Sequence, residues 1–383
     1  MNDLLKKILQ ILKEKGPLKA KKIALLLDPT RTKIIRSDVN SELYKANIDG
    51  LFKDENDVWS YNDFKVLEIS FISNSSWLSA SHIEHALKKH PELLNLSSNV
   101  IFDFSNKSLF LDCILKILSI TNQLINAGSK VTLKFDEDSE SIGYLSRCGF
   151  FDKIHEDVEV LPGRPEISLA KLHNANSETL FEIISINANY DESYLERLDE
   201  LMEAKLSDGD KDFLLNKLST FIGEIVGNIR DHGLSNIDGY IALQIYSSGK
   251  IVIAISDSGA GLITTLRDEA LIYYQANPEL RVLKDPTLTN DIELLKYVFN
   301  KGRISRTGLD ERGLGLSRTN NVLKKISNTK VTNINLTIRQ QTNEIHFPFG
   351  IDGIETLGCR TKQDLTFIKG THFVLTIQLD KNQ

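Results

Sequence analysis

Polar side chains with a spacing suited to one phosphorylated ligand recur in the C-terminal half of the chain. Glu224, Asn228 and His232 are four residues apart, so on a helix they would share a face and could converge on one ligand. Asp257 is followed by Gly259 and Gly261, which combines a carboxylate acceptor with glycines that allow close backbone approach. A second glycine turn comprises Arg312, Gly313, Leu314, Gly315 and Leu316. In this order, the groups are those that a pocket for ATP and Mg²⁺ needs.

The hydrophobic pattern around these residues predicts the elements that position them. Apolar residues recur every three or four positions between 214 and 229, which predicts an amphipathic helix with a separate polar face. The β-branched runs 240–246 and 250–255 flank Ser247-Ser248-Gly249 and predict a hairpin that leads into Asp257. The glycine turn at 313–315 precedes a helical pattern, whose free N–H groups suit phosphate oxygens.

The order of these elements resembles that of the GHKL nucleotide-binding fold. That superfamily includes DNA gyrase, the heat-shock chaperone ATPases, MutL, the histidine kinases and the anti-sigma-factor kinases. The resemblance covers roughly residues 200–380, and Glu-x-x-x-Asn-x-x-x-His-Gly at 224–233 is similar to the motif of the anti-sigma kinases. It implies a two-layer α/β sandwich with an ATP lid between 262 and 312.

The resemblance also implies a role for each candidate site residue. Glu224 would act in catalysis by orienting or deprotonating the attacking water or hydroxyl, and Asn228 would bind Mg²⁺ through its amide oxygen. Asp257 would accept a hydrogen bond from the adenine amine, and Thr371 would make a water-linked contact to the base. The other expected cofactor contacts are His232, Gly259, Gly261, Arg312, Gly313, Leu314, Gly315 and Leu316. For His232, capping of the helix end is the alternative.

The first 64 residues predict a separate small domain. Three helical patterns, at 5–12, 20–27 and 36–46, precede a short hairpin at 50–61. This arrangement resembles a winged helix-turn-helix domain, whose third helix would offer Arg36, Ser37, Asn40 and Lys45 to a DNA major groove. Asp38, Glu42 and the acidic hairpin tip oppose phosphate binding, so protein docking is the alternative to DNA binding.

Residues 65–175 alternate between strand and helix patterns and predict an α/β domain. Strands are expected at 68–72, 100–104 and 130–135, and helices at 83–94, 109–125 and 139–145. The region resembles a STAS domain and could hold a protein partner. Where the related anti-sigma antagonists carry a phosphorylatable serine, this chain has Asp112-Cys113, so a packing role is the alternative to a phosphoswitch.

Composition restricts the class of protein. A chain of 383 residues with 41% hydrophobic residues can form two or three domains with ample cores. Three cysteines without Cys-x-x-Cys spacing favour neither a disulfide framework nor a zinc site. No segment approaches the roughly twenty apolar residues needed to cross a bilayer. We therefore expect a cytoplasmic protein without a membrane partner, divided into domains at 1–64, 65–175 and 176–383. The last domain is expected to begin with a helical segment over 176–215, where Leu180, Ile183 and Ile184 have helical spacing.

These observations lead to one principal function and two alternatives. The principal hypothesis is a slow, Mg²⁺-dependent ATPase that acts as a conformational or homodimerisation switch, in bacterial signalling or defence against phage. The first alternative is a Ser/Thr protein kinase of the anti-sigma type. The second is a DNA-binding regulator that senses ATP without hydrolysing it.

Overall fold

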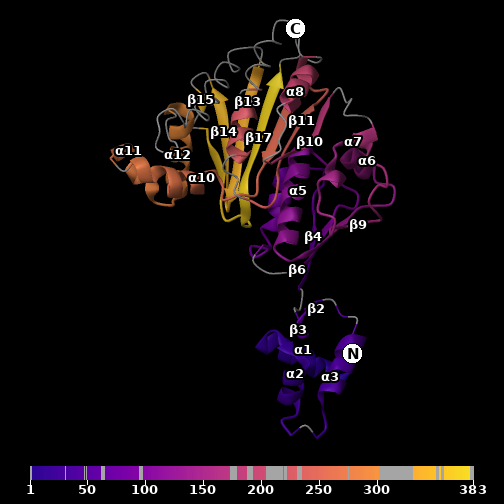
Figure 1. Cartoon of the computed structure of the whole chain (residues 1–383). Helices are drawn as coiled ribbons and strands as arrows, with labels where there is room; N and C mark the ends of the chain where they lie inside the picture. Colours follow the sequence, from indigo (N-terminus) through magenta and orange to yellow (C-terminus); the bar gives the residue numbers. More distant parts are fainter. Residues whose placement is uncertain are drawn as a thin grey trace. The chain divides into compact units, whose positions relative to one another are not determined.

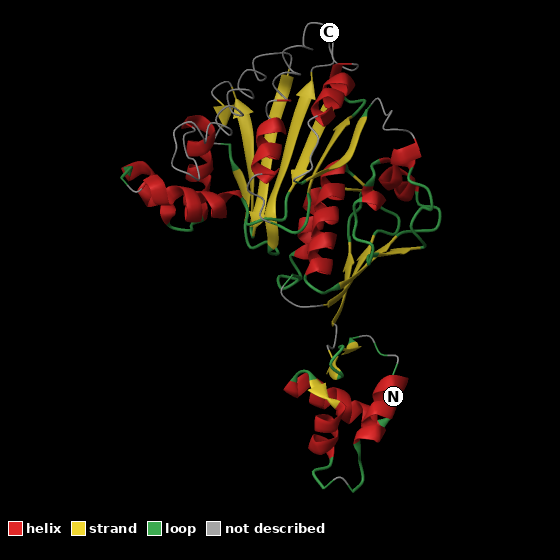
Figure 2. Ribbon diagram, in the orientation of Figure 1, coloured by secondary structure: helices red, strands yellow, loops and turns green. Residues whose placement is uncertain are grey.

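A computed structural model of the chain shows a mixed α/β fold with both parallel and antiparallel strand pairs (Figures 1 and 2). It describes residues 2–30, 32–46, 48, 50–61, 65–94, 98–172, 179–187, 193–203, 219, 222–230, 235–274, 276–301, 331–350, 353–354 and 358–379. The chain divides into two units, Met1–Leu67 with Ser97–Asn99 and Glu68–Leu96 with Val100–Gln383. The regions expected at 65–175 and 176–383 therefore belong almost entirely to one unit.

The first unit consists of three helices and a small antiparallel sheet. The helices are α1 (Asp3–Lys15), α2 (Ala20–Leu27) and α3 (Arg36–Lys45), and the strands β1 (Leu18–Lys19), β2 (Leu51–Lys53) and β3 (Val58–Tyr61) pair in the order β1-β3-β2. The side chain of Asn2 caps α1 by accepting from the Leu5 amide, and α1 stops at Gly16 with a φ of 75°. Ile8, Ile23 and Trp59 belong to the buried core. The three expected helices and the hairpin are confirmed.

The second unit begins with a four-stranded sheet and the helices that alternate with its strands. Strands β4 (Lys65–Ser70), β6 (Ser98–Asp103), β8 (Lys130–Lys134) and β9 (Glu159–Leu161) pair in that order, and β8 is parallel to β9. The connections contain α4 (Ala80–Leu87), α5 (Leu111–Asn126), α6 (Glu140–Arg147) and the parallel pair β5 (Trp77–Leu78) and β7 (Ser108–Leu109). Helix α7 (Leu169–Leu172) follows β9. The expected strand–helix alternation is confirmed.

A larger antiparallel sheet follows in the same unit. Its first strand occupies 180–186, so the helix expected over 176–215 is wrong there and, among the described residues, is confirmed only over 193–203. Its strands are β10 (Leu180–Ile186), β11 (Gly239–Ile245), β12 (Lys250–Ser256), β13 (Val331–Gln341), β14 (Asn343–Gly350), β15 (Gly353–Ile354), β16 (Arg360–Lys362) and β17 (Ile368–Leu379). They pair in the order β10-β11-β12-β17-β13-β14-β15, with β16 also on β14. The hairpin of β11 and β12 turns at Gly249 with a φ of 79°, as the sequence predicts.

Helices cover one face of this larger sheet. They are α8 (Ser193–Glu203), a helix over 222–230, α10 (Leu262–Thr265), α11 (Pro278–Arg281) and α12 (Leu288–Lys301), and short π and 3-10 turns extend α10 through Tyr274. The helical patches expected at 266–274 and 292–299 are therefore confirmed, and α10, α11 and α12 lie beside the β14–β15 end of the sheet in Figure 1. Within the described ranges, every helix is too short or too polar to cross a bilayer.

Strand alternation gives the larger sheet two chemically different faces. Ile253 of β12, Leu375 of β17 and Leu336 of β13 point to the helix-covered face and join one apolar core with Ile222 and Ile225 of the helix over 222–230. The opposite face combines polar side chains with apolar ones such as Val252 and Ala254, and it packs against α5 at β11, β12 and β17. The candidate site lies where the apolar face meets the ends of β12 and β17.

Candidate functional site

Asp257 follows the last residue of β12 and is almost fully buried, at 9% exposure. Its Oδ1 accepts from the Gly259 amide at 2.8 Å, and its Oδ2 accepts from the Thr371 amide at 3.0 Å. Burial raises the pKa of this carboxyl to about 6, against the opposing effect of the amide donors from Gly259 and Thr371. Asp257 is therefore a desolvated acceptor fixed between two backbone segments.

Glycine at two positions allows those segments to meet. Gly370 has a φ of 77°, and a Cβ there would lie 2.0 Å from the carbonyl oxygen of Asp257. Gly261 has a φ of 90°, and a Cβ there would lie 3.3 Å from the Gly370 oxygen. At both positions any other residue would be strained by the positive φ or would clash. The close approach of β17 to the turn after β12 therefore requires glycine at 261 and 370.

The start of α10 is tied to β17 and to β13. The Leu262 amide donates to Thr371 Oγ1 at 2.8 Å, and the Ile263 amide donates to Gln340 Oε1 at 3.1 Å. These bonds satisfy two of the amides that a helix start leaves without intrahelical partners. Thr371 thus links Asp257, through its own amide, to the first turn of α10, through its hydroxyl.

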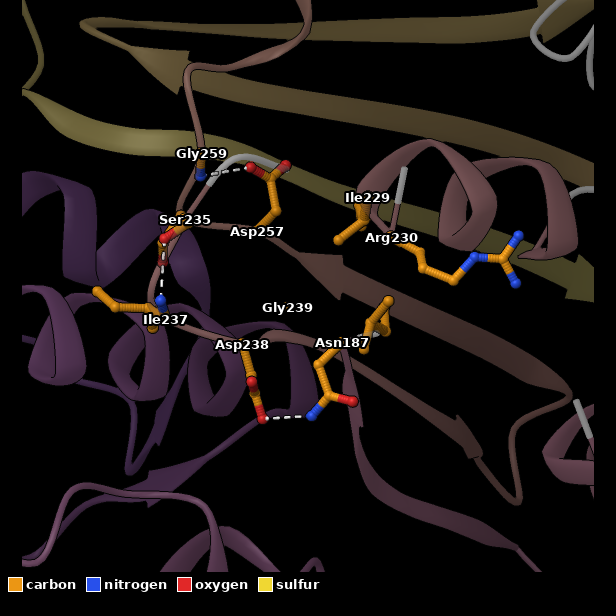
Figure 3. Close-up of a pocket in the computed structure, with 11 residues that line it drawn as sticks. Asn187, Ile229, Arg230, Ser235, Ile237, Asp238, Gly239, Asp257 and Gly259 are labelled. Carbon is orange, nitrogen blue, oxygen red and sulfur yellow. Dashed lines mark hydrogen bonds between the residues drawn. The ribbon is translucent and has the colours of Figure 1, made fainter. Parts of the chain in front are cut away.

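A cavity of about 220 Å³ lies against this corner (Figure 3). It is lined by Ile186, Asn187, Ile229, Arg230, Ser235, Ile237, Asp238, Gly239, Asp257, Ser258 and Gly259. In Figure 3 the hydrogen-bonded pair Asp257 and Gly259 lies across the cavity from the pair Asn187 and Asp238, whose side chains are 3.1 Å apart. The cavity therefore has apolar walls and carboxylate acceptors at two edges.

The helix over 222–230 forms part of the cavity wall at its last turn. Ile229 and Arg230 line the cavity, and the Arg230 side chain extends away from the other labelled residues in Figure 3. A Cβ at Gly239 would lie 2.7 Å from Ile229 Cγ2, so a small residue at 239 lets the helix pack closely against the start of β11. The predicted helix is confirmed over these residues.

The structure brings together only some of the predicted site residues. Asp257, Gly259, Gly261 and Thr371 form the corner described above. Glu224 and Asn228 are half-buried on the cavity-wall helix, and neither lines the cavity. The remaining predictions, His232, Arg312, Gly313, Leu314, Gly315 and Leu316, fall outside the described residues.

Several residues of the site were not anticipated from the sequence. Gln340 reaches the corner from β13, and Asn187 and Asp238 come from the end of β10 and the approach to β11. Gly239, a glycine at the first position of a strand, was the one available signal, because such a glycine can mark close approach of another segment.

The corner is built from a carboxylate, a hydroxyl and backbone amides. Across the described parts of the chain, no group of three or more His, Cys, Asp and Glu side chains could hold a metal ion.

Neither a family model nor a curated protein sequence matches this chain. The assignment of function therefore depends on the geometry of the cavity and of the Asp257 corner.

Proposed function

We propose that residues 176–383 form a GHKL-type site for ATP and Mg²⁺ that hydrolyses ATP slowly and acts as a conformational or dimerisation switch. The observation that carries the proposal is the buried Asp257 carboxylate, which lines an apolar-walled cavity and is held by the amides of Gly259 and Thr371. ATP and Mg²⁺ are the proposed cofactors.

The cavity supports an adenine base as its occupant. Ile186, Ile229 and Ile237 supply apolar walls for a flat ring. Asp257 supplies an acceptor that the exocyclic amine of adenine can satisfy. A site built to hydrogen-bond one group of its ligand discriminates strongly against an analogue that lacks the group, because buried polar atoms would then be left unpaired.

For the phosphate chemistry we propose two half-buried residues of the cavity-wall helix that lie outside the cavity lining. Asn228 lies one residue before Ile229, and Glu224 lies one turn further back on the same helix. In the proposed site Asn228 holds Mg²⁺ through its amide oxygen, and Glu224 orients or deprotonates the attacking water. Bound Mg²⁺ would neutralise charge on the phosphates.

The rest of the chain supports a regulatory setting for this site. The three helices and small sheet of the first unit are consistent with a winged helix that binds DNA or protein, and the alternating strands and helices at 65–175 are consistent with a STAS-like region that binds a protein partner. We place the protein in the cytoplasm, in bacterial signalling or phage defence.

Calorimetric titration of the full chain with ATP and Mg²⁺ tests the binding step. We expect saturable binding by the wild type and none by Asp257→Asn, because an asparagine cannot accept from both amides with two oxygens. Asp103→Asn is the matched control. Asp103 Oδ1 also accepts from an amide two residues later, that of Ser105, at 3.0 Å, but Asp103 belongs to the smaller sheet. Unchanged ATP affinity in Asp257→Asn would remove Asp257 from the site.

ATP labelled at the γ-phosphate tests the chemistry. Release of free phosphate supports the ATPase, and label on the protein supports the kinase alternative. Glu224→Ala is expected to bind ATP normally and to lose turnover. If Glu224→Ala keeps full biological activity, hydrolysis is dispensable and the ATP-sensing regulator is the better description.

A further inference from the structure

Helix α5 buries polar side chains against the larger sheet, although it belongs to the alternating region at 65–175. Ser119, Asn122 and Gln123 are at most 7% exposed. Asn122 donates to the Tyr240 hydroxyl of β11 at 2.8 Å. Ser119 and Gln123 instead contact the turn after β12, directly behind Asp257.

The Gln123 amide joins the two segments that form the candidate site. Its Nε2 lies 3.0 Å from Ser258 Oγ and 3.1 Å from the Lys369 carbonyl oxygen. Its Oε1 accepts from the Lys369 amide at 2.9 Å. Ser119 Oγ adds contacts at 3.2 Å to Ser258 Oγ and at 3.0 Å to Gln123 Nε2. One side chain thus pairs with both backbone groups of Lys369 and with the hydroxyl of Ser258.

These two attachment points flank the groups proposed to bind the base. Ser258 lies between Asp257 and Gly259, and Lys369 immediately precedes Gly370 and Thr371. On the opposite face of the sheet, the Asp257 carboxylate spans the same two segments through the amides of Gly259 and Thr371. The turn and the strand are therefore fixed to each other from behind by Gln123 and from the front by Asp257.

Each oxygen of the Asp257 carboxylate accepts from one amide, that of Gly259 or that of Thr371. The carboxylate keeps a lone pair directed at a ligand only if these two amides stay at the same separation. Gln123 fixes that separation independently of any ligand, because Gln123 and Ser258 are buried and the Gln123 side chain pairs with both the amide and the carbonyl of Lys369. Pre-organisation of this kind places the acceptor before the ligand arrives.

We propose that the region at 65–175 supports the nucleotide site from the opposite face of the sheet. In this proposal Gln123 of α5 is a positioning residue, which sets the selectivity of Asp257 for a purine with a 6-amino group. This inference rests on the proposed function, since it concerns how the same cavity recognises its base. The alternative is that α5 packs on the sheet without affecting recognition.

The test compares ATP with ITP, which carries an oxygen in place of the 6-amine and has the same triphosphate. In Gln123→Ala we expect the preference for ATP over ITP to fall by roughly tenfold, the effect of losing about one well-placed hydrogen bond. A merely structural role would lower stability and weaken both nucleotides equally, leaving the ratio of their dissociation constants unchanged.

Asn122→Ala provides the matched control on the same helix. It removes a buried amide that contacts Tyr240, Lys153 and His155 and touches neither Ser258 nor Lys369. We expect it to lower the melting temperature and to keep the wild-type ratio. If Gln123→Ala does not fold, Ser119→Ala removes only a hydroxyl and should shift the ratio in the same direction by a smaller factor.

The outcomes separate this inference from the proposed function. A wild type that does not bind ATP overturns both. A wild type that prefers ATP, together with Gln123→Ala that keeps the same preference, overturns only the role of Gln123. A reduced ratio in Gln123→Ala with an unchanged ratio in Asn122→Ala supports the proposal.

Discussion

The two faces of the larger sheet are held by different kinds of interaction. On one face, Ile253, Leu336 and Leu375 pack with helices in an apolar core. On the other face, Glu84 of α4 accepts from Lys116 Nζ of α5 at 2.6 Å and from Arg339 Nε of β13 at 2.9 Å. These three charged side chains are nearly inaccessible to solvent, and we call the face that α4 and α5 cover the polar face.

The two faces therefore differ in how they tolerate side-chain substitutions. Apolar packing is non-directional, so its free energy varies gradually with the volume of the side chain. A buried ion pair depends on geometry, because an unpaired charge would remain in a medium that solvates it poorly. The polar face thus fixes one arrangement of α4 and α5 on the sheet, and the apolar face supplies bulk stability.

Glu84→Ala is expected to produce the largest effect, because it leaves Lys116 and Arg339 buried with one carboxylate fewer. Burial opposes ionisation of Glu84, yet Lys116 and Arg339 outweigh it and hold the pKa of this carboxyl below its ordinary value. We expect the free energy of unfolding of the second unit to fall by about 3–5 kcal/mol. Urea denaturation followed by Trp77 fluorescence, in a Trp59→Phe background that silences the first unit, measures it.

Glu293→Ala is the control for that prediction, because Glu293 belongs to the same unit. Glu293 pairs with Lys296 on α12 at 3.5 Å, where both side chains are more than a third exposed. Loss of such a surface pair should leave the stability nearly unchanged. A Glu84→Ala protein with wild-type stability would show that the polar face contributes no specific constraint.

Gly370→Ala is expected to have the next largest effect and to act at the meeting point of the two faces. A non-glycine residue at positive φ costs about 1–3 kcal/mol, and the Cβ would also collide with the Asp257 carbonyl. We expect reduced stability and loss of ATP binding in calorimetry. Gly143→Ala, in α6 with open space around its Cβ, should keep both properties. ATP binding by Gly370→Ala would argue against the close approach of β17 to Asp257.

The smallest effect predicted is a pH dependence of base selectivity. Burial raises the pKa of Asp257 to about 6, above its ordinary value of 3.8. In the ligand-free protein, this group contributes stability that is fully present below the unfolded pKa and is lost as the pH rises through about 6. Recognition of the 6-amine needs the ionised acceptor, so it changes with pH in the opposite direction.

We expect the preference for ATP over ITP to fall by roughly tenfold between pH 7 and about pH 5, since about one carboxyl in ten is ionised one unit below its pKa. Comparing two triphosphates cancels the titration of the phosphates themselves. The measurement is the ratio of the two dissociation constants across this range. A ratio that does not change with pH would place the base away from Asp257.

Local patterns in the sequence were sufficient to predict the hairpin beside the site, but they predicted a helix where β10 is a strand. The β-branched runs before and after Ser247-Ser248-Gly249 predicted the hairpin of β11 and β12, and Asp257, Gly259 and Gly261 were correctly placed after its second strand. These features depend on interactions between residues close in sequence. Strand alternation and glycine turns therefore identified them.

The polar face could not be predicted in this way. Arg339 has the alternation of a solvent-facing strand residue, yet it is buried against Glu84, 255 positions away. Gln123 has the spacing of a polar helix face, yet its partners Ser258 and Lys369 are 135 and 246 positions away. A single sequence gives no indication of such long-range pairs, because either residue alone looks like an ordinary surface residue.

The most direct test of the central claim is a crystal structure of the full chain with Mg²⁺ and a non-hydrolysable ATP analogue. We expect the adenine ring to lie between Ile186 and Ile229, with its 6-amino nitrogen within hydrogen-bonding distance of an Asp257 carboxylate oxygen. An analogue bound elsewhere, or an adenine in this cavity whose amine faces away from Asp257, would contradict it.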